Sequence, residues 1–236
     1  MSGRGIRDIW DTIVSSIERL SSTNCYERIN LLASLGLVNR YRRIAARLLP
    51  CRGTILDAGC GPGTSTAVLL SRCKGRARIV ALDPSTSMLR RAPSAPSCMR
   101  LGGRFEKLPL ASSSIDGIVA MFSYRDATSY DEALEEFARV LKPRGVLVVL
   151  DIFRPTGLIA RTLLKGYLYG VGLLGGLLTM CPGEGRSYAS IMYTIDRMLS
   201  IGEMEEAMGR LFEGVSVYRG PFIAVVWGRK PSSPAG

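Results

Sequence analysis

The chain of 236 residues contains no histidine. Histidine is the usual general base near neutral pH and the commonest metal ligand, so its absence removes both roles. The cysteines stand at positions 25, 51, 60, 73, 98 and 181, and no two of them form a Cys-x-x-Cys pair. Zinc sites normally use such pairs, and the sequence therefore predicts no metal site. We expect each cysteine to act as a small buried apolar residue, and the sequence leaves open whether any of them form disulfides.

Acidic residues are scarce relative to basic ones. The chain has 20 Asp and Glu against 31 Lys and Arg, which gives a net charge of +11. Such an excess favours anionic partners, such as nucleic acid or anionic lipid. The basic residues are scattered, apart from the cluster Arg40, Arg42, Arg43 and Arg47, and no basic run is interleaved with aromatic residues as in an RNA-reading surface. We therefore expect contact with a membrane surface, and nucleic acid is disfavoured.

The sequence also lacks a long uncharged apolar run. Charged residues interrupt the N-terminal region every few positions, so no signal peptide is expected there. Residues 158–180 are rich in Gly and Leu, but only residues 166–182 are free of charge, which is short of the ~20 residues of a spanning helix. We expect a cytoplasmic protein, peripheral on the inner face of the membrane, in which this segment forms a cap that dips into the bilayer. The alternative is an ordinary buried helical hairpin.

Apolar runs alternate with helix-competent stretches along most of the chain. The runs that predict strands are residues 54–58, 77–82, 98–101, 115–120, 145–152, 214–219 and 222–229. The stretches that predict helices are residues 6–20, 26–35, 37–49, 63–73, 85–91, 130–141 and 202–212. This alternation indicates a parallel sheet with helices on both faces. We predict an α/β, Rossmann-like, doubly wound and mostly parallel seven-stranded sheet with a terminal antiparallel hairpin, N-terminal helices and a helical cap insertion.

An acidic residue precedes a glycine-rich turn after the first predicted strand. Residues 54–63 read Thr-Ile-Leu-Asp-Ala-Gly-Cys-Gly-Pro-Gly. The turn contains three alternating glycines, Gly59, Gly61 and Gly63. Asp57 would repel the pyrophosphate of a nicotinamide dinucleotide, but it suits a ligand that carries an ammonium group. The alternative is that the glycines only form a tight strand-to-helix turn that Asp57 caps.

A second acidic residue follows the next predicted strand. Asp83 stands at the end of the apolar run 77–82, where its carboxylate can accept hydrogen bonds from both hydroxyls of a ribose. The ligand that combines an amino-acid ammonium, a ribose and an adenine is S-adenosylmethionine. The sequence therefore predicts this cofactor.

Four regions carry a family resemblance. They are Tyr26-Glu-Arg-Ile-Asn30 with Ser34-Leu-Gly-Leu37 and Arg40-Tyr-Arg-Arg43, then Glu106-Lys-Leu-Pro-Leu110, then Met121-Phe-Ser-Tyr-Arg-Asp126, and Glu136 to Pro155. Residues 52–92 resemble the core of class I S-adenosylmethionine-dependent methyltransferases. Together the four regions resemble the menaquinone/ubiquinone biosynthesis C-methyltransferases.

The sequence departs from that family pattern at a few positions. Asp126 replaces the usual Asn after Arg125, and Ser123-Tyr124 replaces Gly-Leu. Met121 stands where a serine is often found, and Arg104 stands where Asn or Asp often contacts the adenine. The first two departures bear on the substrate, and the last two bear on cofactor contacts.

The motifs and the resemblance together imply three sets of site residues. The cofactor set is Asp57, Gly59, Cys60, Gly61, Gly63, Asp83, Pro84, Met88, Arg104, Phe105 and Met121. The catalytic set is Arg125, Asp126 and Tyr26. The substrate set is Asn30, Phe122, Tyr124 and Tyr188. We expect Arg125 to stabilise a phenolate, and Asp126 to orient a water or accept the ring proton. The alternative for Arg125-Asp126 is a surface ion pair.

The chain is expected to divide into four parts. They are a helical segment over the active site (1–50), the cofactor-binding core (51–155), a helical cap with substrate contacts (156–200), and a helix and hairpin that complete the sheet (201–236). The resemblance implies C-methylation of a prenylated quinol precursor, such as a demethylmenaquinol. The alternatives are a methyltransferase for another lipid or a small phenol, and a non-catalytic subunit that binds the cofactor.

Overall fold

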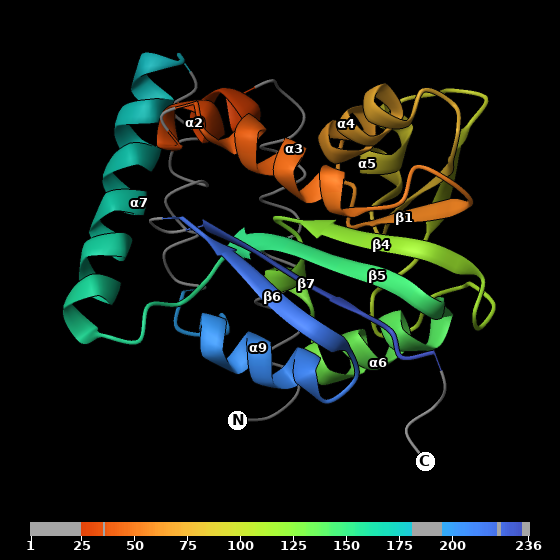
Figure 1. Ribbon diagram of the computed structural model, residues 1–236. Coiled ribbons are helices and arrows are strands. Elements are labelled where there is room, and N and C mark those ends of the chain that lie inside the picture. Colours follow the sequence, from red (N-terminus) through yellow and green to blue (C-terminus); the bar gives the residue numbers. More distant parts are fainter. Residues whose placement is uncertain (1–24, 35, 181–194, 221–222, 233–236) are drawn as a thin grey trace. The chain divides into compact units, whose positions relative to one another are not determined.

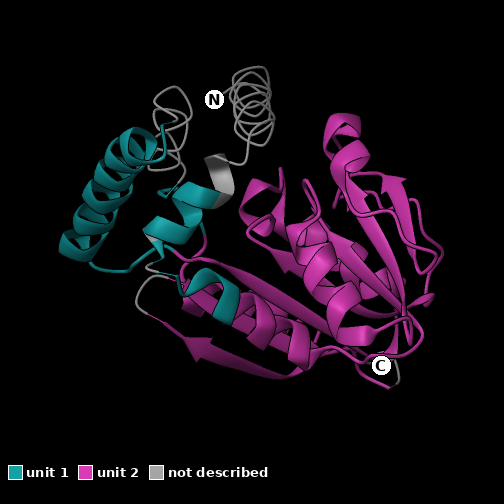
Figure 2. Cartoon of the chain, turned by 90° about the horizontal axis from the view of Figure 1, so that it is seen from above, with its two compact units in different colours: residues 1–40, 154–198 teal, residues 41–153, 199–236 magenta. Residues whose placement is uncertain are grey.

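The structure, a computed structural model, describes residues 25–34, 36–180, 195–220 and 223–232 (Figure 1). The chain splits into two compact units (Figure 2). Unit 1 comprises residues 1–40 and 154–198, and unit 2 comprises residues 41–153 and 199–236. Residues 41–50, which the sequence pattern grouped with the N-terminal helices, therefore belong to the unit that contains the sheet. The helix expected at residues 6–20 lies outside the described residues.

Seven strands of the described part of unit 2 form one sheet. They are β1 (Thr54–Ala58), β2 (Arg78–Asp83), β3 (Cys98–Gly102), β4 (Ile115–Met121), β5 (Leu141–Ile152), β6 (Glu213–Arg219) and β7 (Ile223–Arg229). Their order is β3-β2-β1-β4-β5-β7-β6, and only β7 runs antiparallel to its neighbours. This arrangement confirms the predicted sheet and its terminal hairpin. β5 begins before the predicted residue 145 because Leu141 already pairs with Ile115, ahead of a bulge.

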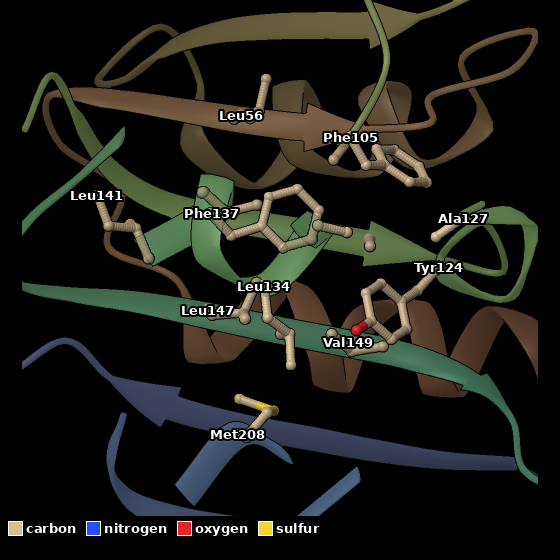
Figure 3. Close-up of a cluster of buried hydrophobic side chains, with 14 of the residues drawn as sticks. Leu56, Phe105, Tyr124, Ala127, Leu134, Phe137, Leu141, Leu147, Val149 and Met208 are labelled. Carbon is tan, nitrogen blue, oxygen red and sulfur yellow. The ribbon is translucent and has the colours of Figure 1, made fainter. Parts of the chain in front are cut away.

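Helices cover both faces of this sheet (Figure 1). They are α3 (Val38–Leu48), α4 (Thr64–Cys73), α5 (Thr86–Arg91), the 3-10 turn η1 (Tyr124–Asp126), α6 (Tyr130–Val140) and α9 (Ile201–Gly209). Alternate residues of a strand point to opposite faces, so Leu147 and Val149 of β5 pack in one cluster and Val148 and Leu150 in another. Figure 3 shows the first cluster, in which Phe137 of α6 lies against the strands. The strands are buried on both sides, which explains their nearly continuous apolar runs.

Unit 1 contains two described helices, α2 (Cys25–Ala33) and α7 (Leu158–Leu178), which contact each other. α7 is one helix of 21 residues, although its glycines lower helix propensity. Gly175 shows what such a glycine contributes, because a Cβ there would lie 3.3 Å from Ile29 of α2. None of the described helices is long and apolar enough to cross a membrane.

Two of the cysteines depart from the expectation of separate apolar side chains. Cys51, before β1, and Cys73, at the end of α4, form a disulfide with a Cα–Cα distance of 5.1 Å. Cys60 is buried as a free thiol, in agreement with the prediction, and Cys98 is half-buried. The sequence alone did not identify the pair, since 22 residues separate its members.

Candidate active site

The predicted cofactor and catalytic residues of unit 2 gather at one edge of the sheet. β1, β2, β4 and β5 run parallel, so their carboxyl ends lie at the same edge. Asp57, Asp83 and Asp151 stand at the ends of β1, β2 and β5. The strand order reverses between β1 and β4, and open α/β sheets bind ligands at such a switch point.

The glycine turn after β1 is shaped by its contacts with the protein. Gly59, Gly61 and Gly63 have φ values of +70°, +54° and +90°, which L-residues with side chains rarely adopt. A Cβ on Gly59 would lie 2.4 Å from the Cβ of Ser123, and one on Gly63 would lie 2.2 Å from Pro93. A Cβ on Gly61 would meet nothing within 4 Å. Two of the glycines thus permit close packing, and the space beside the Cα of Gly61 is open to a ligand.

Asp57 is a completely buried carboxylate with one oxygen engaged. Its Oδ2 accepts hydrogen bonds from Ser65 Oγ at 2.7 Å and from Thr66 Oγ1 at 2.6 Å. Its Oδ1 is buried and has no hydrogen-bond partner among the described residues. Burial raises the pKa of the Asp57 carboxyl from 3.8 to about 6, against the lowering effect of the two hydroxyls.

A buried oxygen without a donor is costly, and most such atoms in folded proteins have a partner. The ammonium group of a ligand would supply the donor that Asp57 Oδ1 lacks, so this geometry fits S-adenosylmethionine. Asp57 also ties α4 to β1 through Ser65 and Thr66. Sequence reasoning missed these two hydroxyls, although a Ser-Thr pair in the first turn of the helix after the motif was the available signal.

The carboxylate of Asp83 supports the glycine turn through hydrogen bonds. Its Oδ2 accepts a hydrogen bond from Gly61 N and its Oδ1 accepts one from Ser85 N, each at 2.9 Å. Its carboxylate can accept about four hydrogen bonds in all, so this position is compatible with ribose hydroxyls as further donors. The ribose contact itself remains a prediction.

The remaining expected cofactor residues surround this edge with mostly buried side chains. Pro84 and Arg104 are exposed, whereas Cys60, Met88 and Met121 are buried. Phe105 is also buried, and its ring packs edge-on against Phe137 with the centroids 5.7 Å apart. A Cβ on Gly59 would lie 2.9 Å from this ring, so Phe105 supports the glycine turn from the core side.

Arg125 forms a buried ion pair. Its close partner is Asp151, and the neighbouring Asp126 is farther away. Its Nη1 donates to Asp151 Oδ1 at 2.8 Å, and its backbone N–H donates to Oδ2 at 3.1 Å. The two side chains are 6% and 3% exposed, so the surface-pair alternative is wrong. Sequence reasoning missed Asp151 as a site residue. Its signal was an acidic residue at the end of an apolar strand, as for Asp57 and Asp83.

Asp126 lies beside this pair. Its Oδ1 is 4.0 Å from Arg125 Nε, and its side chain is 25% exposed. Burial raises the pKa of the Asp126 carboxyl from 3.8 to about 6, although the neighbouring Arg125 lowers it. A carboxylate with a pKa near neutrality is suited to accept a proton.

The predicted role of Tyr124 as a substrate residue is not supported by its position in the structure. Its side chain is 3% exposed and belongs to the cluster in Figure 3, and its hydroxyl donates to the Tyr130 carbonyl at 2.8 Å. Burial raises the pKa of its phenol. The η1 turn directs this ring into the core, where it packs against Tyr130 and Phe137. Tyr124 is therefore a packing residue and does not line a substrate wall.

Phe122 and Arg42 form a contact that the sequence did not predict. The guanidinium carbon of Arg42 lies 5.6 Å from the centroid of the Phe122 ring. Arg42 is only 4% exposed, so it cannot contribute to an exposed basic cluster that attracts anionic lipid, whereas Arg40 and Arg43 are exposed. Its positive charge lowers the pKa of Asp57, which places Arg42 in the electrostatic field of the site. The sequence did contain a signal for this burial. Arg42 follows the helical period of the buried residues Tyr41, Ala45 and Leu49, so its side chain faces the core.

The other predicted residues belong to unit 1. Asn30 is half-buried on α2. Tyr26 lies on the same helix, but its side chain is outside the described part of the structure, as is Tyr188. The roles of these three residues therefore remain predictions.

Comparisons with known proteins give consistent results. Residues 56–149 match the family model described as methyltransferase domain. The chain is 34% identical over 188 residues to the ubiquinone/menaquinone biosynthesis C-methyltransferase UbiE of Syntrophotalea carbinolica, which covers 75% of this chain and 76% of that protein. It is 26% identical over 219 residues to the demethylmenaquinone methyltransferase of Desulfitobacterium hafniense, with 87% and 85% covered.

Solved structures agree on the fold. A Haloferax volcanii complex between the Trm112 methyltransferase activator and a methyltransferase described as putative matches with a TM-score of 0.62 and 17% identity, over 91% of this chain and 97% of that one. A methyltransferase from Methanococcus maripaludis matches with a TM-score of 0.58 and 16% identity, over 99% and 98%. At these identities the likeness concerns the fold alone.

Proposed function

Because this chain belongs to the family of ubiquinone/menaquinone biosynthesis C-methyltransferases, we propose that it methylates a ring carbon of a prenylated quinol, such as a demethylmenaquinol. The chain is an S-adenosylmethionine-dependent methyltransferase. The observation that carries the proposed substrate class is the buried Arg125–Asp151 pair beside Asp126, at the edge that also holds the glycine turn. A phenolic ring needs a cation for its oxyanion and an acceptor for its proton, and these side chains supply both.

We propose that three residues hold the cofactor. Asp57 Oδ1 would accept from the ammonium group, Asp83 would accept from the ribose hydroxyls, and the open space beside the Cα of Gly61 would let the ligand approach closely. When bound, S-adenosylmethionine supplies a methyl group that is already activated as a sulfonium. The chain therefore needs little acid–base chemistry on the cofactor side, and its residues serve mainly to position the ring carbon and to exclude water.

Arg125 and Asp126 have different proposed roles toward the quinol. The ring carbon becomes a nucleophile when a neighbouring hydroxyl is ionised, and the Arg125 guanidinium would stabilise that oxyanion. Asp151 holds Arg125 through its side chain and its backbone, which fixes the direction of the cation. After methylation, the ring loses a proton as it regains aromaticity. Asp126 would accept this proton, directly or through a water molecule.

Access to a prenylated substrate suggests contact with the bilayer. α7 carries large exposed apolar side chains, namely Leu158, Ile159, Leu163, Leu174, Leu177 and Leu178, followed by Met180. Apolar side chains on a helix that does not span the bilayer are typical of an interfacial segment. We therefore propose that the protein meets its substrate at the membrane surface, with α7 as the contacting element.

The test is transfer of a labelled methyl group from S-adenosylmethionine to chemically reduced demethylmenaquinone in detergent micelles, followed by mass spectrometry of the product. The expected product carries the label on a ring carbon. Transfer only to a soluble phenol would replace the quinol by a small phenolic substrate. Cofactor binding in calorimetry without transfer to either acceptor or to a lipid extract would instead identify a non-catalytic subunit.

A further inference from the structure

A hollow lies at the edge of the sheet in unit 2 that is opposite the candidate active site. Its volume is about 390 Å³. It is lined by the end of α3, the segment before β1, and the start of β5, together with the last residue of β7. The parallel strands begin at this edge, whereas the cofactor residues stand where the strands end. The hollow is therefore separate from the active site.

The wall of this hollow is strongly basic. Its charged residues are Arg52, Lys142, Arg144, Arg229 and a single carboxylate, Asp116. Four cations against one carboxylate leave an excess of three positive charges.

Asp116 neutralises only part of that charge. Its Oδ2 accepts hydrogen bonds from Lys142 Nζ and from Thr54 N, both at 2.8 Å. Arg52, Arg144 and Arg229 are exposed and form no ion pair with a described carboxylate. These three guanidinium groups can therefore offer hydrogen-bond donors to an anion in the hollow.

Arg144 occupies a backbone position that favours glycine. Its φ is +63°, in the left-handed region that residues with a side chain rarely adopt. Its backbone is held there by a hydrogen bond from Arg144 N to the Lys230 carbonyl at 2.9 Å. An arginine at such a position costs stability relative to glycine, and strained residues of this kind gather at ligand sites. Unlike a glycine, Arg144 contributes a charged side chain to the wall of the hollow.

The other parts of the wall are fixed in place. The Cys51–Cys73 disulfide anchors the segment that carries Pro50 and Arg52 to α4. On the other side of the hollow, Lys230 N donates to the Gly145 carbonyl at 2.8 Å and so joins the end of β7 to the start of β5. A wall held in this way loses little freedom when a ligand binds.

We propose that this hollow binds the phosphate or diphosphate group of a small molecule. Guanidinium groups match phosphate oxygens with paired hydrogen bonds, and three of the four cations are arginines. The volume is in the range of small-ligand sites. Leu48, Leu49 and Val146 give the hollow an apolar part that would contact the organic portion of the ligand. The phosphate can come from a soluble phosphate ester or from the headgroup of an acidic phospholipid.

The first measurement is calorimetric titration of the full chain with inorganic pyrophosphate. Wild type should bind saturably at millimolar concentration, and Arg144→Gly and Arg229→Gln should each bind at least tenfold more weakly. Because glycine suits a φ of +63°, Arg144→Gly should melt at the same temperature as wild type or higher, which separates lost binding from lost folding. Arg78→Gln is the matched control, since Arg78 is exposed at the start of β2 but does not line the hollow, and it should bind like wild type.

The second measurement distinguishes the two sources of phosphate. Sedimentation with phosphatidylcholine vesicles that contain phosphatidic acid should be weaker for Arg144→Gly than for wild type if the ligand is a lipid headgroup. Equal sedimentation of the two proteins, with pyrophosphate still bound only by wild type, assigns the site to a soluble ester. If wild type binds no pyrophosphate and the variants sediment like it, the proposal is wrong. An RNA oligonucleotide bound equally by wild type and Arg144→Gly, without pyrophosphate binding, would also overturn it.

Discussion

The guanidinium of Arg125 and the carboxylate of Asp151 lie 2.8 Å apart and are almost completely buried. Burial of two charges is favourable only when their geometry and further hydrogen bonds compensate the loss of water. Asp151 meets this requirement, since it accepts hydrogen bonds from the side chain and the backbone of Arg125 and from Ile152 N. The pair thus holds a cation in one orientation at the edge of the sheet where the substrate is proposed to bind.

Arg125→Lys should lower turnover at least tenfold and leave the affinity for S-adenosylmethionine nearly unchanged. Lysine retains the charge but lacks the planar fork that contacts Asp151 and the oxyanion together. Turnover is measured with the reduced quinone, and affinity by calorimetry. Arg210→Lys, at an exposed position, is the control and should behave like wild type. Unchanged turnover in Arg125→Lys would make Arg125 a purely structural residue.

Asp126 should impose a pH dependence on turnover. A proton acceptor with a pKa of about 6 is increasingly protonated as the pH falls below 6, so turnover should decrease about tenfold for each further pH unit. Asp126→Asn should lack this acidic limb and retain activity within about tenfold at pH 7.5, because an amide still orients a water molecule. Identical pH profiles for the two proteins would exclude Asp126 as the titrating group.

Asp57→Asn should weaken cofactor binding. A hydrogen bond between charged groups contributes ~1.5–3 kcal/mol, so the loss should be at least tenfold. S-Adenosylhomocysteine carries the same ammonium group and should lose affinity to the same degree. A defect confined to S-adenosylmethionine would mean that Asp57 responds to the sulfonium instead.

Asp57→Asn should also stabilise the fold at neutral pH. The pKa of Asp57 is raised from 3.8 to about 6, so its ionisation destabilises the folded state, and this effect grows as the pH rises from about 4 to about 6. The shift corresponds to roughly 3 kcal/mol at pH 7 and above. Urea unfolding should therefore show a stability gain for the variant at pH 7.5 that shrinks toward pH 4. A gain that does not depend on pH would contradict this origin.

Exposed leucines of α7 should control membrane binding. Leu174 and Leu178 are 62% and 73% exposed, and replacing both with Ser removes apolar surface that would enter the bilayer interface. Wild type should sediment with anionic liposomes at low salt, and the double variant should remain largely in the supernatant with unchanged cofactor affinity. Met99→Ser changes an exposed apolar residue of β3 and is the control. Wild type that stays in the supernatant at low salt would exclude the membrane contact.

The sheet could be predicted from the sequence because its strands are buried on both faces and are separated by turn residues and helices. The glycine turn, Asp57 and Asp83 could be found for a similar local reason, because each stands at a fixed place relative to an apolar run.

Tyr124 was misassigned because nothing in the local pattern states which way a ring points after a short 3-10 turn. Arg42 was taken as a surface residue because the basic cluster outweighed the helical period of its neighbours. The partner of Arg125 was missed because Asp151 is 26 residues distant and meets it only in the folded sheet.

The Cys51–Cys73 disulfide should contribute measurably to the stability of unit 2. It closes a loop across a sequence separation of 22 residues, which in the chain-entropy model corresponds to about 3 kcal/mol. The double variant Cys51→Ser/Cys73→Ser should therefore unfold at lower urea concentration than wild type, and a reducing agent should lower the midpoint of wild type toward that of the variant. Among the described cysteines of the variant, Cys60 and Cys98 are free thiols and add no bond that a reducing agent could break. Wild type and variant with equal midpoints under oxidising conditions would show that the bond adds no stability. Because the bond anchors the segment before β1, its loss should also weaken pyrophosphate binding in the basic hollow more than cofactor binding at the opposite edge.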